Sequence, residues 1–92
     1  MAEARIRRRY VFSGFVQGVG FRYRARHAAE LFGVTGWVRN DLSGTVTMEL
    51  QGGAAAIEAV REAIERGRYV RVEDVSVREL PLETEEHGFS VR

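Results

Sequence analysis

The chain has 92 residues, 45% of them hydrophobic and 29% charged, with a formal net charge of +1. This length predicts one domain over residues 1–92 with one core, and the near-neutral charge provides no strong field to attract nucleic acid or an anionic membrane. The absence of cysteine and lysine excludes disulfides, cysteine nucleophiles, Schiff-base chemistry and a P-loop lysine.

The first predicted element is a strand over residues 5–15, which is rich in β-branched, aromatic and basic side chains. Its alternation does not show which face is buried. Glycines at positions 18 and 20 interrupt the pattern, and a helix follows with apolar residues at 21, 25, 28, 29 and 32. Gly33 is a natural end for this helix.

A short second strand over residues 34–40 leads through turn residues 41–44 into a third strand. In the third strand, apolar residues at 46, 48 and 50 alternate with polar residues at 47, 49 and 51. This alternation predicts one face against the core and the other against water or a ligand. Trp37 and Tyr23 are expected in the core, with a place beside a substrate cleft as the alternative.

The second half of the chain predicts one more helix and two more strands. An apolar stripe over residues 56–64 indicates the helix, which Gly67 closes. Val75 and Val77 mark a fourth strand that Pro81 breaks, and residues 89–92 form a short terminal strand. The order β-α-β-β-α-β predicts a ferredoxin-like α+β sandwich, with two helices on one face of an antiparallel sheet.

Residues 15–22 connect the first strand to the first helix and are the best candidate for an anion site. The N–H groups that open a helix have no intrahelical partners, and the two glycines let the backbone approach a phosphate closely. Arg22 stands near the positive end of the helix dipole, which disfavours a cation by about 0.3–1 kcal/mol. A phosphate bound at the loop would make the positive charge of Arg22 favourable at the start of the helix. A simple tight turn with an exposed arginine is the alternative.

Two motifs then point to a family. The stretch GFVQGVGFR at 14–22 resembles the G-x-V-Q-G-V-x-F-R signature of the acylphosphatases, and GWVRN at 36–40 with GTV at 44–46 resembles their second signature. The resemblance covers nearly the whole chain. Phe12 departs from the smaller aliphatic residue usual at that place, which concerns packing rather than chemistry.

The resemblance implies an enzyme that hydrolyses acyl phosphates to a carboxylate and inorganic phosphate without a metal, a cofactor or a phosphoenzyme. It implies two catalytic residues, Arg22 holding the phosphate and Asn40 orienting the attacking water. Phosphoryl transfer requires mainly positioning and charge stabilisation, which agrees with such a site. Asn40 is the only asparagine in the chain and would otherwise be a turn residue beside Asp41 and Ser43. The implied phosphate-binding residues are Val16, Gln17, Gly18, Val19, Gly20, Phe21 and Arg22.

Other functions are weaker expectations. His27 and His87 have no second ligand at metal-binding spacing, so no metal site is expected. Arginines 7–9 with Tyr10 and Phe12 could form an RNA-binding platform, but a solvated strand that resists aggregation is favoured. A non-catalytic anion or RNA-binding module is therefore the alternative to an enzyme.

The location of the protein is predicted from segments that the sequence lacks. No apolar stretch approaches the roughly 20 residues that span a bilayer, and the N-terminus has no apolar run typical of a secretory signal. We therefore expect a cytoplasmic protein, a monomer by default, whose partner is a small acyl phosphate. Similar domains open hydrogenase maturation proteins that handle carbamoyl phosphate, but the end of the chain at Arg92 favours a free-standing enzyme.

Overall fold

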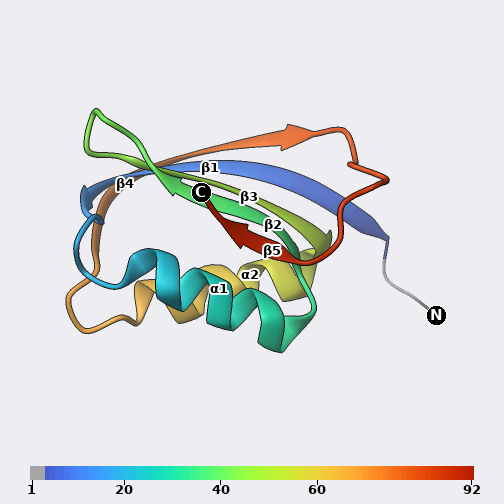
Figure 1. The fold of residues 1–92 in the computed structure, drawn as a ribbon, viewed down its shortest axis with the longest axis horizontal. Coiled ribbons are helices and arrows are strands. Elements are labelled where there is room, and N and C mark those ends of the chain that lie inside the picture. Colours follow the sequence, from blue (N-terminus) through green and yellow to red (C-terminus); the bar gives the residue numbers. More distant parts are fainter. Residues whose placement is uncertain (1–3) are drawn as a thin grey trace.

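A computed structural model describes residues 4–92, which contain two helices and five strands (Figure 1). The elements are β1 (Arg5–Phe15), α1 (Phe21–Phe32), β2 (Thr35–Asn40), β3 (Val46–Gly53), α2 (Ala54–Glu65), β4 (Arg71–Leu80) and β5 (Phe89–Val91). The predicted order of elements is confirmed. The ends differ from the predicted ones by at most two residues, except that β4 begins at Arg71, four residues before the valine that marked it. The fold is a ferredoxin-like α+β sandwich.

The strands form one sheet in the order β4-β1-β3-β2-β5. β1 pairs antiparallel with β3 and β4, and β2 pairs antiparallel with β3. The antiparallel sheet predicted for the four main strands is confirmed, and the short extra strand β5 pairs parallel with β2, which makes the complete sheet mixed. The physical reason is the connection over residues 81–88, which crosses from one edge of the sheet to the other before β5 begins.

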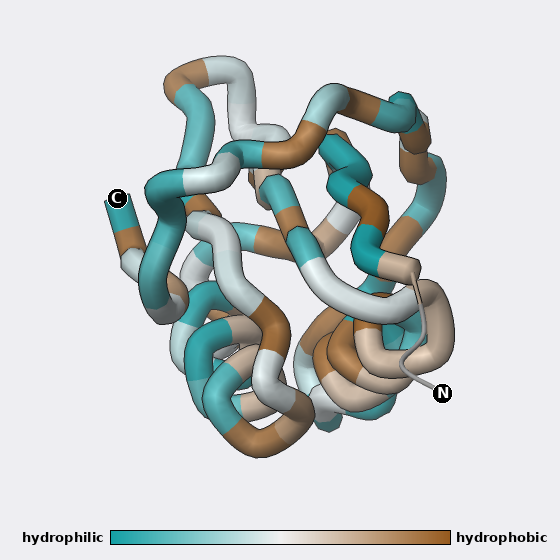
Figure 2. Tube along the Cα trace, turned by 90° about the vertical axis from the view of Figure 1, so that its right-hand side faces the viewer, coloured by the Kyte–Doolittle hydropathy of each residue, from teal (hydrophilic) through white to brown (hydrophobic). Residues whose placement is uncertain are grey.

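Both helices lie side by side on one face of the sheet, where they enclose the core (Figures 1 and 2). The apolar stripe of each helix meets the inward rows of β1 and β3, so that Tyr10 and Phe12 are fully buried. The Phe12 ring lies 5.7 Å from that of Tyr10 and 5.0 Å from that of Phe21. Phe12 therefore fills the centre of the core, and burial of such a side chain contributes about 1.5–3 kcal/mol.

Part of the opposite face of the sheet, over β1 and β3, is covered too, which corrects two expectations. The polar residues of β3, namely Thr47, Glu49 and Gln51, are buried rather than exposed to water. Arg7 is only 2% exposed, so the solvated strand predicted for arginines 7–9 is wrong at that position. The reason is the 81–88 connection, in which the backbone N–H of Glu83 donates to Gln51 at 2.8 Å.

Trp37 lies on this covered face and not among the core residues around Phe12. Its indole is buried, as expected, but its neighbours are the guanidinium groups of Arg39 and Arg92, at 5.1 and 4.7 Å from the ring. Tyr23 is 76% exposed, so its predicted place in the core is wrong. It begins the outward face of α1 and stacks on His27.

Gly36 is required by the close pairing of β2 and β3. Its φ of 143° lies in the region that favours glycine, and a Cβ there would approach the Glu49 carbonyl oxygen to 1.8 Å. Because Gly36 lies four residues before Asn40 on the same strand, this close approach helps to set where the end of β2 lies.

Candidate active site

The loop between β1 and α1 presents a row of backbone N–H groups. Gly18 and Gly20 take left-handed conformations, with φ of 71° and 81°. The first hydrogen bond of the helix runs from the Arg24 N–H to the Gly20 carbonyl, at 3.0 Å. Within residues 4–92, the N–H groups of residues 16–23 have no hydrogen-bond acceptor. These donors are free to bind an anion.

The side chains of this loop mostly point elsewhere. Val16 and Phe21 are buried in the core, and Val19 packs against it. The Gln17 side-chain amide donates hydrogen bonds to the turn between β2 and β3. Of the predicted phosphate-binding residues 16–21, the structure therefore offers backbone groups rather than side chains.

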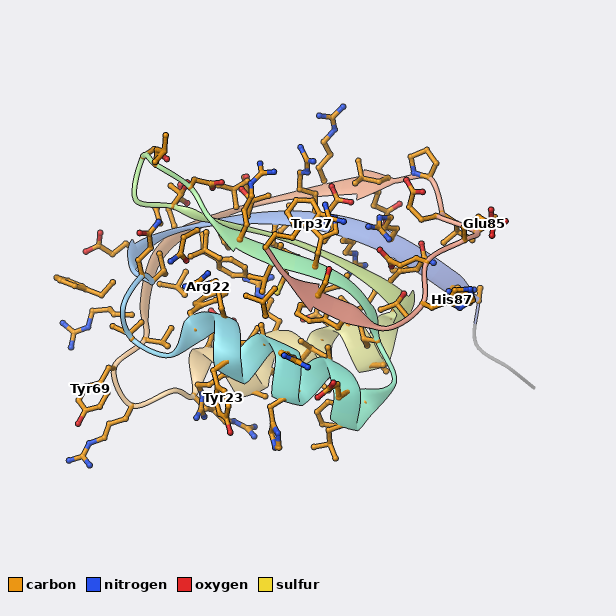
Figure 3. All side chains as sticks on the ribbon, in the orientation of Figure 1. Arg22, Tyr23, Trp37, Tyr69, Glu85 and His87 are labelled. Atoms are coloured by element: carbon orange, nitrogen blue, oxygen red, sulfur yellow. The ribbon has the colours of Figure 1, made fainter. Side chains whose placement is uncertain are left out.

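Arg22 lies in the first turn of α1, where its side chain borders the concave side of the loop. Figure 3 labels it between the helix and the sheet, with Tyr23 on the opposite side of the same turn. A pocket of about 180 Å³ is lined by Val16, Gly18, Gly20, Phe21, Arg22 and Tyr23. Arg22 forms no ion pair with any residue that the structure describes, and the first helical turn contains no acidic residue. Its positive charge is therefore not neutralised.

Asn40 is the last residue of β2, and its position follows from the strand pairing. Val46 of β3 pairs with Asn40 on one side and with Phe12 of β1 on the other. Asn40 therefore lies two strands from β1, a separation of about 10 Å between backbones. Its side-chain Oδ1 is buried and accepts no hydrogen bond from the described residues. An unpaired buried acceptor is costly, which is typical of a group that binds a ligand or water.

The turn that follows Asn40 contains a connected set of hydrogen bonds. The Asp41 carboxylate accepts from the hydroxyls of Thr45 at 2.8 Å and Thr47 at 2.6 Å, and from Arg39 Nε at 3.0 Å. Burial opposes ionisation of Asp41, but the hydrogen bonds from Thr47, Arg39 and Thr45 outweigh it and lower the pKa of the carboxyl.

Gln17 joins this turn to the loop. Its Nε2 donates to the carbonyl oxygens of Asp41 at 2.8 Å and Thr45 at 2.9 Å. Both ends of the candidate site thus lie at the same end of the sheet (Figure 1). The sequence predicted Asp41 as a turn residue, with contact to substrate as the alternative, and Gln17 as a phosphate-binding residue. Nothing local indicates their contact across 24 positions.

A larger pocket of about 390 Å³ borders the same loop. It is lined by Phe15, Val19, Arg68, Tyr69, Val70 and Arg71. Phe15 and Tyr69 are mostly exposed, and the Arg68 guanidinium lies 5.7 Å from the Tyr69 ring. The pocket therefore offers aromatic and cationic surface next to the row of N–H groups.

Two further features are absent from residues 4–92. No group of three or more His, Cys, Asp or Glu side chains there is arranged to hold a metal ion. Neither helix in this part of the chain is long and apolar enough to cross a membrane.

Comparison with known proteins identifies the family. The family described as acylphosphatase matches residues 8–91. This chain belongs to the acylphosphatase family. It is 42% identical over 81 residues to the acylphosphatase of Oceanobacillus iheyensis, covering 86% of this chain and 89% of that protein. It is 46% identical over 85 residues to that of Rubrobacter xylanophilus, covering 91% of this chain and 77% of that protein.

Solved structures agree with this assignment. The crystal structure of an acylphosphatase from Bacillus subtilis superposes with a TM-score of 0.86 at 34% identity, covering 95% of this chain and 98% of that one. Full-length HypF in a phosphate- and nucleotide-bound form contains a similar domain, with a TM-score of 0.87 at 28% identity, but the match covers only 12% of that chain. As an acylphosphatase, the protein is an enzyme of the acyl phosphate hydrolase class. The non-catalytic alternative is not favoured.

Proposed function

We propose that this acylphosphatase holds the phosphate of its substrate between the N–H groups of residues 16–22 and the side chain of Arg22, while Asn40 orients the attacking water. One observation carries the proposal: among the residues that the structure describes, loop N–H groups without acceptors lie beside an arginine without an ion pair. The two catalytic residues are thus Arg22 and Asn40, and residues 1–92 act as a single domain with one core.

The phosphate-binding groups act by charge and by geometry. Successive N–H groups from the loop and the first helical turn surround the equatorial oxygens, and the helix dipole adds favourable potential for an anion. The planar guanidinium of Arg22 donates two parallel hydrogen bonds to the same group. These donors are in place before the substrate binds, so they can stabilise the transition state without rearranging.

Asn40 supplies the acceptor for the nucleophile. Its buried Oδ1 accepts a hydrogen bond from water, which directs an oxygen lone pair towards phosphorus. The water oxygen bonds to phosphorus as the bond to the acyl oxygen breaks, and the water proton passes to the phosphate or to solvent. The products are a carboxylate and inorganic phosphate. Because a carboxylate is a good leaving group, the mechanism needs no general acid.

The acyl group would leave on the side of the loop that faces the larger pocket. Phe15 and Tyr69 offer aromatic surface there, and the pocket is open to solvent on one side. This arrangement supports tolerance for acyl groups of different size, including an aromatic one.

The activity is tested with purified protein, benzoyl phosphate and a chelator, by following the loss of ultraviolet absorbance. We expect turnover that the chelator does not reduce and that inorganic phosphate inhibits competitively. No turnover above the buffer rate, together with binding of phosphate or an oligonucleotide, would establish the non-catalytic module instead.

A further inference from the structure

The two halves of the proposed site belong to elements that do not touch directly. The loop follows β1, Asn40 ends β2, and β3 lies between the two strands. A misplacement of about 1 Å between a nucleophile and its target can reduce a rate by roughly 10²-fold. Some contact must therefore hold the end of β2 at a constant position relative to the loop.

The Gln17 side chain makes that contact from the loop side. Its single amide nitrogen donates both hydrogens, one to the Asp41 carbonyl and one to the Thr45 carbonyl. The same two carbonyls accept the backbone hydrogen bonds that close the turn, from Gly44 at 3.1 Å and from the Asp41 N–H at 2.9 Å. Gln17 is thus bonded to the turn where the turn is most rigidly defined.

The Asp41 side chain holds the turn from the other side. One carboxylate oxygen accepts from Thr45, just before β3, and from Thr47 on β3, and the other accepts from Arg39 on β2. Asn40 lies between Arg39 and Asp41 in the chain, so both of its neighbours are restrained by the same carboxylate. Asp41 itself lines neither pocket that borders the loop.

We propose that Asp41 and Gln17 are positioning residues: the Asp41 carboxylate orients Asn40, and the Gln17 amide sets the distance from Asn40 to the phosphate loop. This inference rests on the proposed function, since it assigns how Asn40 is held rather than what it does. It predicts that disturbing Asp41 lowers kcat through Asn40 while phosphate affinity, which comes from the loop and Arg22, is retained.

The test compares Asp41→Ala with Ser43→Ala as a matched control on the same turn. The Ser43 hydroxyl lies 3.0 Å from that of Thr45 but bonds neither the Asp41 carboxylate nor Gln17. We expect Asp41→Ala to lower kcat roughly 10-fold or more, with the inhibition constant of inorganic phosphate unchanged. Ser43→Ala leaves both values unchanged. Gln17→Met, which disconnects the loop as well, lowers kcat and weakens phosphate inhibition together.

A spectroscopic measurement separates positioning from a loss of stability. Because Asn40 is the only asparagine, selective nitrogen-15 labelling of asparagine gives the signal of one side-chain amide. Neither Asp41→Ala nor Ser43→Ala adds a second such signal. In the parent and in Ser43→Ala we expect inorganic phosphate to shift this signal. In Asp41→Ala the signal starts at another position, and phosphate shifts it less.

The outcomes distinguish the two proposals. An Asp41→Ala enzyme whose kcat and amide signal match those of Ser43→Ala would overturn the inference, whatever its thermal stability. The inference is also overturned if adding Asp41→Ala to the Asn40→Ala enzyme lowers kcat by the same factor as adding it to the parent. The effect of Asp41 would then not act through Asn40. A parent in which phosphate leaves the Asn40 signal unmoved and Asn40→Ala is fully active would instead refute the proposed role of Asn40.

Discussion

Arg7 and Glu86 lie 79 positions apart in the sequence yet share two parallel hydrogen bonds, at 2.8 and 3.0 Å. The same guanidinium donates to Glu49 at 2.9 Å and to Gln51 at 3.2 Å. Burial lowers the pKa of Arg7, but the hydrogen bonds and charges of Glu86 and Glu49 outweigh it and raise the pKa overall. This arginine therefore holds the 81–88 connection, and with it β5, against the sheet.

Removing Arg7 should unfold the protein more easily. In Arg7→Met the buried Glu49 keeps, within residues 4–92, only Arg9 as a partner, and loss of one member of a buried charge network costs roughly 3–5 kcal/mol. The matched control is Arg8→Met, whose half-buried side chain pairs with the exposed carboxylates of Glu58 at 3.2 Å and Glu79 at 3.9 Å, so that its loss costs about 1 kcal/mol or less. Urea denaturation measures the loss in the free energy of unfolding for both variants. Equal losses in the two variants would contradict the structural role of Arg7.

The stability should also fall at acid pH through Glu86. Burial raises the pKa of Glu86, but the hydrogen bonds of Arg7 and Thr35 and the charges of Arg7 and Arg92 outweigh it and lower the pKa below its ordinary value of 4.5. Its contribution is therefore fully present above that value and is lost as the pH falls through the lower pKa of the folded state. We expect a declining free energy of unfolding below about pH 4.5, measured by urea titrations at several pH values. Glu86→Gln should flatten that decline, and an unaltered decline would argue against this pair.

Arg22→Ala should abolish most of the activity while leaving the fold intact. Loss of one preorganised contact to the transferring phosphoryl group lowers kcat/KM by at least roughly 10²-fold. Arg22→Lys keeps the charge but not the planar fork, so it should recover only part of the rate. Arg26→Ala, on an exposed part of the same helix, is the control and should leave kcat/KM unchanged. Steady-state kinetics with benzoyl phosphate measures kcat/KM for each variant, and circular dichroism checks that the fold is intact.

Asn40→Ala should act on the chemical step rather than on binding. We expect kcat to fall by at least roughly 10²-fold, with competitive inhibition by inorganic phosphate retained because the loop and Arg22 remain. Removal of the unpaired Oδ1 also predicts an unchanged or higher melting temperature, since a buried acceptor without a partner is destabilising. A native enzyme with full kcat would exclude Asn40 from catalysis.

Gly36→Ala should be strongly destabilising for a steric reason. A methyl group there meets the Glu49 carbonyl oxygen at 1.8 Å in addition to the unfavourable φ, so we expect a loss of about 3 kcal/mol or more. Gly33→Ala is the control, because its φ is also positive but no atom lies within 4 Å of the added carbon. That change should cost only about 1–2 kcal/mol. Similar losses in chemical denaturation would show that β2 and β3 can separate slightly.

Features that depend on neighbouring residues could be predicted from the sequence. The order of elements followed from apolar periodicity, and the glycines at 18 and 20 before Arg22 indicated the row of free N–H groups. Such features are local, because backbone conformation and the unpaired groups of a helix start depend on a few adjacent positions. The two family motifs are local in the same sense, and they led to the correct family.

The residues that meet across the sheet could not be predicted from the sequence, because they depend on how the chain folds. The burial of Arg7, the parallel pairing of β5 and the two hydrogen bonds of Gln17 all depend on segments that are distant in sequence. The alternation in β3 predicted a polar face correctly, but not that the 81–88 connection covers it. An alternating pattern reports which side chains share a face, whereas the partner of that face depends on strand order and on where the chain returns.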